Sequence, residues 1–186
     1  MTLALVLGLT LSQTPLTPVD AMRGDMKTYF AGETSEGWAF GGLGLVSVGS
    51  ATGLLLSNTN LGRGMSVPLF AVGVIQLALA IGLFVRTPGQ VAGFDAQLTN
   101  APAEYKTGET TRMERVMRGF AIYKAAEVGL FFGGVALSGA GGISKSDFAL
   151  GAGITLAAEA LVMLILDFYA EGRGRVYQAA ISGFTF

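Results

Sequence analysis

The chain contains no cysteine and no histidine. Their absence excludes disulfide bonds, thiol nucleophiles, imidazole bases, histidine-ligated haem and structural zinc sites of the usual kinds. Any bound metal would have to be a hard cation held by oxygen ligands. Since the sequence also lacks a clustered acidic motif, we expect no cofactor, no metal site and no catalytic residues. The sequence thus favours a non-enzymatic protein.

Charged residues are also scarce, at 13% of the chain, whereas they make up about a quarter of an ordinary soluble domain. Hydrophobic residues reach 51%, and 28 glycines accompany them. The net charge of -1 provides no surplus of Lys and Arg for phosphates, so we expect no nucleic-acid partner. This composition predicts one domain embedded in a lipid bilayer, in which glycine lets helices pack closely.

Long apolar runs dominate the sequence. Residues 148–169 form a run of 22 residues that is polar only at Thr155, Glu159 and Asp167, and this length is enough for one helix to cross a bilayer. The four predicted spans are about residues 37–57, 66–86, 120–140 and 148–169. We therefore predict an all-α, polytopic membrane protein with four transmembrane helices.

Amphipathic segments flank these spans. Apolar residues recur at helical spacing between residues 19 and 30, with charged residues among them. Thr87 followed by Pro88 is a helix-start signal, so we expect the second span to break at Arg86 and a short interfacial helix to follow, up to residue 98. A charged amphipathic segment precedes the third span, and a polar helical tail follows the fourth. We expect these amphipathic helices to lie on the cytoplasmic side.

The distribution of basic residues determines the predicted orientation. Nine Lys and Arg residues fall on the side that holds both termini and the connection between the second and third spans, and only Arg63 and Lys145 fall on the other side. Cytoplasmic segments carry the excess of Lys and Arg in membrane proteins. We therefore expect a multi-pass protein of the cell (inner) membrane with both termini in the cytoplasm.

Residues 1–18 form an N-terminal segment that is either disordered or signal-like. Residues 3–11 are apolar but too short to cross a bilayer, and they have the character of a signal-peptide core. Cleavage of such a signal would invert every span and expose the basic side. The charge distribution therefore disfavours the signal-peptide interpretation.

The two halves of the chain resemble each other. A shift of 94 residues aligns the Tyr-x-x-x-Glu element at Tyr29 with the one at Tyr123, and a shift of 83 residues aligns Gln76 with Glu159. Both halves enter from the cytoplasmic side, so we interpret them as a parallel repeat of two-span hairpins about an axis along the membrane normal. The two copies are residues 19–98 and 99–186. Chance similarity between glycine-rich apolar segments is the alternative.

Glu159 falls near the middle of the fourth span, where a charged carboxylate costs about 3 kcal/mol. The predicted intramembrane polar cluster consists of Glu159, Gln76, Glu127, Lys124 and Ser47. Two interpretations remain open. Glu159 either binds a proton, a cation or a polar substrate on a path through the bundle, or it is protonated and hydrogen-bonds Gln76 or a serine to fix the register of the helices.

A second group of charged residues gathers at the cytoplasmic ends of the spans. It consists of Arg86, Arg112, Arg115, Arg118, Asp167, Glu171 and Arg173. Such residues support acid–base chemistry only when they converge in a pocket. We expect instead a solvated charged collar that anchors the helices and contacts anionic lipid headgroups.

These features favour a structural or accessory membrane protein that acts by helix–helix association. The glycine pairs at small-xxx-small spacing, such as Gly49 and Gly53, suit close contact with a second copy or with a larger membrane complex. The alternative is a small transporter, channel or proton-coupled carrier centred on Glu159. A water-filled cavity that reaches Glu159 would favour the alternative.

Overall fold

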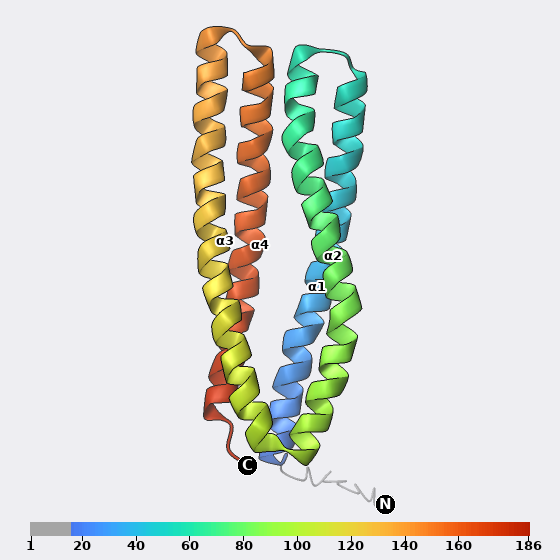
Figure 1. Ribbon diagram of the computed structural model, residues 1–186, viewed down its shortest axis with the longest axis vertical. Coiled ribbons are helices and arrows are strands. Elements are labelled where there is room, and N and C mark those ends of the chain that lie inside the picture. The colour runs from blue at the N-terminus through green and yellow to red at the C-terminus, as the bar shows by residue number, and fades with distance from the viewer. Residues whose placement is uncertain (1–15) are drawn as a thin grey trace, which may run out of the picture.

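The computed structural model describes residues 16–186, which form four long α-helices joined by short turns (Figure 1). The helices are α1 (Pro18–Leu56), α2 (Asn60–Asn100), α3 (Pro102–Ser144) and α4 (Asp147–Gly183). Each helix contains a stretch long and apolar enough to cross a membrane. The predicted all-helical fold with four such helices is therefore confirmed. The expectation for residues 1–18 falls almost wholly on residues outside the described part of the chain.

The helices form two hairpins that stand side by side. The pair α1–α2 and the pair α3–α4 pack most extensively, and α2 also packs against α4. In the upper part of Figure 1, α1 and α3 flank this central α2–α4 contact. Both ends of the described chain lie with the α2–α3 turn at one end of the bundle, and the other two turns lie at the opposite end. We call the latter the loop end.

Local sequence signals explain where the helices begin and end. The side chains of Thr17, Thr59 and Ser146 each accept a hydrogen bond from a backbone N–H in the first turn of the following helix. Asn58 and Lys145 adopt the left-handed conformation, with φ of 58° and 55°, and this reverses the chain at the loop end. The two turns at the loop end are short because each has a capping residue and a left-handed residue in the right place.

The expectation that the second span breaks at Arg86, and that the amphipathic segment before the first span is a separate surface helix, was wrong, whereas the segments next to the third and fourth spans continue them as expected. Helix α1 runs without interruption through both segments, and α2 continues past Arg86 with Pro88 inside it. The hydroxyl of Thr87 donates to Glu33 Oε2 at 3.3 Å and does not cap a new helix. Pro88 has no N–H to donate and so removes only one intrahelical hydrogen bond from the long helix α2.

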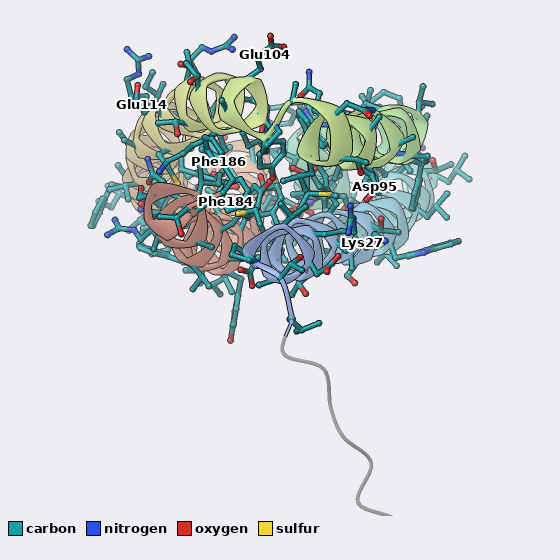
Figure 2. The ribbon with its side chains drawn as sticks, turned by 90° about the horizontal axis from the view of Figure 1, so that it is seen from below. Lys27, Asp95, Glu104, Glu114, Phe184 and Phe186 are labelled. Carbon is teal, nitrogen blue, oxygen red and sulfur yellow. The ribbon has the colours of Figure 1, made fainter. Side chains whose placement is uncertain are left out.

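The bundle divides into two halves of different character. We define the apolar half as residues 37–86 and 120–169, and the charged half as residues 18–36, 87–119 and 170–186. The core of the charged half is an aromatic and methionine cluster of Met22, Met26, Tyr29, Phe30, Leu98, Tyr105, Met113, Tyr177, Ile181 and Phe184. These apolar faces were expected to lie on a membrane surface, but all four helices turn them toward one another. Figure 2 shows Phe184 inside the ring of helices and Glu104 and Glu114 outside it.

Glycine holds the helices of the apolar half together. A Cβ atom on Gly44 would lie 2.8 Å from the carbonyl oxygen of Gly73, and one on Gly134 would lie 2.8 Å from that of Gly153. Between the hairpins, a Cβ on Gly151 would lie 2.5 Å from the carbonyl oxygen of Leu61. Backbones approach this closely only where no side chain intervenes.

Candidate functional site

Three of the five predicted cluster residues meet inside the apolar half. Ser47 Oγ of α1 donates to Glu159 Oε1 of α4 at 2.7 Å, and Gln76 Nε2 of α2 donates to Glu159 Oε2 at 3.1 Å. All three side chains are buried, Gln76 completely. The carboxyl group of Glu159 thus has a donor on each oxygen, and it joins three helices.

The glycine contacts position this cluster. A Cβ on Gly73 would lie 2.9 Å from Cβ of Ser47, so the absence of a side chain on Gly73 lets α1 bring Ser47 up to Glu159. On the side toward the charged half, Phe40, Ala80 and Leu83 form an apolar layer with partly buried side chains packed against it. The cluster is therefore enclosed by close helix contacts and by apolar side chains.

The two best-defined surface grooves of the described residues do not reach Glu159. Both lie between α1 and α2. One is lined by residues such as Thr34 and Pro88, in and beside the charged half, and the other by residues such as Thr52 and Phe70, near the loop end. Glu159 lines neither of them.

Lys124 and Glu127 lie apart from Glu159, near the boundary between the two halves. Lys124 Nζ donates to Glu171 and lies 4.6 Å from the centre of the Phe168 ring. Glu127 is buried, close enough to Asp167 and Lys124 for electrostatic interaction. Asp167 lies eight positions after Glu159 in α4, which is about 12 Å along a helix. The five predicted residues therefore form two separate layers, one of Ser47, Gln76 and Glu159 and one of Lys124 and Glu127.

The expectation of a solvated charged collar was wrong for most of its members. Asp167 and Glu171 are both only 8% exposed, and Arg173 forms an ion pair with Glu36 at 2.7 Å. Arg86 pairs with the buried Glu33 at 3.3 Å. Arg86, with its side chain 55% exposed, and Arg115 and Arg118 are exposed in the way that the sequence suggested. Helix packing buries the other four wholly or in part, because the segments that carry them belong to the bundle.

The most buried charge pair of the charged half was not predicted. Arg112 donates two hydrogen bonds to Glu109, at 2.7 and 2.6 Å, and Glu109 is 1% exposed. The Arg112 guanidinium also lies 5.3–5.6 Å from the centres of three aromatic rings, those of Tyr29, Phe30 and Phe94. The rings come from α1 and α2, so this one side chain ties three helices together.

Two tyrosines complete this buried network. Tyr177 donates to Glu109 Oε1 at 3.0 Å, and the hydroxyl groups of Tyr105 and Tyr177 are 2.6 Å apart. Burial, and then the charge of Glu109, raises the pKa of Tyr177 above its usual value, so its hydroxyl keeps its proton as a donor. The spacing of Glu109 and Arg112, three residues apart on a helix, was the only sequence signal for this network.

Comparisons with protein-family models, with curated proteins and with solved structures found no match. In the described residues, no group of three or more acidic side chains is arranged to hold a metal ion. The buried polar groups instead connect helices: Ser47, Gln76 and Glu159 in the apolar half, and the Glu109–Arg112 network in the charged half.

Proposed function

We propose that the chain is a multi-pass membrane protein with four spans. The support is a belt of exposed large apolar side chains, which occupies residues 38–56 of α1, 61–85 of α2, 122–143 of α3 and 148–169 of α4. At about 1.5 Å per residue these stretches are roughly 27–36 Å long, which suits the ~30 Å hydrocarbon core of a bilayer. Elsewhere in residues 16–186, only Leu16, Val176 and Phe186 are large, apolar and exposed.

Aromatic and basic residues support the proposed orientation. Trp38, Tyr123 and Tyr169 are 72%, 61% and 76% exposed, and each lies at the end of the belt that adjoins the charged half. Trp and Tyr are typical of the membrane–water interface, and an excess of Lys and Arg is typical of the cytoplasmic side. The charged half then projects into the cytoplasm and carries both termini, and the loop end faces the opposite side of the cell (inner) membrane.

The natural absence of cysteine allows a clean test of this topology. A single cysteine at Asn60 should react with a membrane-impermeant maleimide in intact cells, because Asn60 is exposed at the loop end. A single cysteine at Thr107, exposed in the charged half, should react only after permeabilisation. The cysteine-free parent is the control and should remain unlabelled. The reverse pattern would overturn the orientation, and equal labelling of both positions in intact cells would overturn the membrane placement.

We infer further that the protein acts as a structural or accessory subunit through helix association. The observation that supports this is the outer face of α3, whose most apolar window is 11% buried, against 33% for α4. A stripe of small exposed residues at four-residue spacing follows this face: Ala121, Ala125, Gly129 and Gly133. Neither glycine contacts a neighbouring helix. Such a stripe lets another helix approach closely in lipid.

The geometry favours this role over transport centred on Glu159. Both oxygens of Glu159 have donors from Ser47 and Gln76, and neither groove is lined by Glu159. A carboxyl group held in this way fixes the register of α1, α2 and α4. We therefore assign it a structural role.

The proposed duplication is consistent with these contacts. The two hairpins enter from the same end, and the direct contact of Gln76 with Glu159 joins the two positions that the sequence shift pairs. An axis along the membrane normal would pass between them. In the first span of each copy a shift of 92 residues pairs Gly37 with Gly129. The copies differ there, because Gly37 packs against Phe84 whereas Gly129 faces outward. The second copy thus keeps a free packing surface that the first uses internally.

Substitution of the α3 stripe tests the association. The full chain in mild detergent or nanodiscs should run as an oligomer or with membrane partners, and Gly129→Leu with Gly133→Leu should weaken that association roughly tenfold or more. Gly82→Leu on α2 is the control, because Gly82 also opens onto free space and has no place in the stripe. Light scattering and crosslinking measure the outcome. A parent chain that is strictly monomeric and recovers no partner would refute the proposal.

A further inference from the structure

Glu127 of α3 and Asp167 of α4 form a buried pair of carboxyl groups at the boundary between the two halves. Each side chain is only 8% exposed, and each has one oxygen that is buried without a hydrogen-bond partner in the described structure, Oε2 of Glu127 and Oδ2 of Asp167. The two groups are close enough to interact electrostatically. A buried carboxylate without donors is strongly disfavoured unless its charge is compensated.

The nearby cations are already engaged by other carboxylates. Lys124, Glu171 and Glu36 interact electrostatically with the pair, and the ion pairs nearby along the helices also involve Glu33, Arg86, Arg173 and Arg175. Within this set, Arg86 pairs with Glu33, Arg173 with Glu36, and both Lys124 and Arg175 with Glu171. Among residues 16–186, Glu127 and Asp167 therefore have no ion-pair partner, and the one cation that interacts with them is Lys124.

Two neighbouring carboxyl groups, Glu171 and Glu36, differ from Glu127 and Asp167 because each of them has a cation as a direct partner. Hydrogen bonds from Lys124 and Arg175 lower the pKa of Glu171, so this group stays ionised and retains both cations. Burial raises the pKa of Glu36 even though Arg173 opposes the effect, so burial at this level of the bundle already favours the protonated form of a carboxyl group that has a cation. Glu127 and Asp167 are more deeply buried and lack such a cation.

We propose that Glu127 and Asp167 together form a proton-binding site that holds one proton in the folded protein. One proton removes one of two adjacent buried negative charges and supplies the donor that the pair lacks. The remaining carboxylate is balanced by Lys124. The site lies beside the charged half, within one or two turns of the exposed interfacial residues Tyr123 and Tyr169, so that protons can exchange with the cytoplasm on the proposed topology. This inference does not depend on association through α3.

Infrared spectroscopy of the purified full chain tests the site, because a protonated carboxyl group has a carbonyl band distinct from that of a carboxylate. The parent protein should show such a band that disappears as the pH is raised. Glu127→Gln and Asp167→Asn, whose side chains are close in shape to the protonated groups, should each remove this titrating band. Glu159→Gln is the matched control, since Glu159 is also buried in the bundle, and it should leave the band in place.

A second variant tests the site without altering either carboxyl group. Lys124→Met removes the nearby positive charge, so the proton should be held more tightly and the band should disappear at a pH about 1–3 units higher. Lys145→Met, at the distant α3–α4 turn, should leave the transition unchanged. The proposal is overturned if neither Glu127→Gln nor Asp167→Asn removes a titrating band, or if Glu159→Gln alone removes it. An unshifted transition in Lys124→Met would likewise overturn it.

Discussion

Replacement of Glu109 by Ala is expected to destabilise the folded bundle by about 3–5 kcal/mol, because it leaves the Arg112 charge buried without its partner. The substitution removes both hydrogen bonds from Arg112 and also the acceptor for the Tyr177 hydroxyl. Unfolding of the purified chain by denaturant in detergent, followed by circular dichroism, measures the loss. We expect the midpoint to fall well below that of the parent protein.

Two further variants distinguish the loss of the Glu109–Arg112 ion pair from general effects of substitution on α3. Glu114→Ala, on the outer side of the same helix, should change the free energy of unfolding by no more than about 0.5 kcal/mol (Figure 2). The double variant Glu109→Leu with Arg112→Met should recover most of the loss, because apolar residues of similar size can replace a buried ion pair. A Glu109→Ala protein as stable as the Glu114→Ala protein would show that Arg112 finds water or another partner, and would contradict the structural role.

The apolar half could be predicted well because lipid-sized apolar runs leave few alternatives. The four runs each fall within one helix, and the exposed apolar belt covers nearly the same residues as the predicted spans. The predicted depth of Gln76 and Glu159 along their spans was also sufficient to predict that these two residues meet. The contact with Ser47 follows from the same argument, because small residues on α1 leave only a short distance to the centre of the bundle.

The charged half could not be predicted because periodicity identifies an apolar face but not what covers it. The pattern at residues 19–30 fits a helix on a membrane surface and equally a helix in a bundle. What decides between them is the partner face, which residues 87–98, 105–117 and 170–181 supply from elsewhere in the chain. Glu109 was missed for the same reason, since its burial depends on aromatic rings that come from α1 and α2.

Substitution of Gly134 by Ala should separate the α3–α4 hairpin and destabilise it by about 1–3 kcal/mol or more. The added Cβ would lie 2.5 Å from the backbone nitrogen of Ala157 and 2.8 Å from the carbonyl oxygen of Gly153. Both atoms belong to the backbone of α4, so no side chain can rotate away and the helices themselves must move. Unfolding titrations in detergent should show a lower midpoint for this variant than for the parent.

Gly139→Ala provides the matched control on the same helix. A Cβ at Gly139 meets nothing within 4 Å, so the substitution adds only the higher helix propensity of Ala, which is worth up to about 1 kcal/mol in a soluble helix. We therefore expect opposite signs for one chemical change at two positions five residues apart. Equal effects of the two substitutions would mean that close contact of the α3 and α4 backbones does not hold this hairpin together, and its stability would then have to come from side chains such as Lys124 and Glu171.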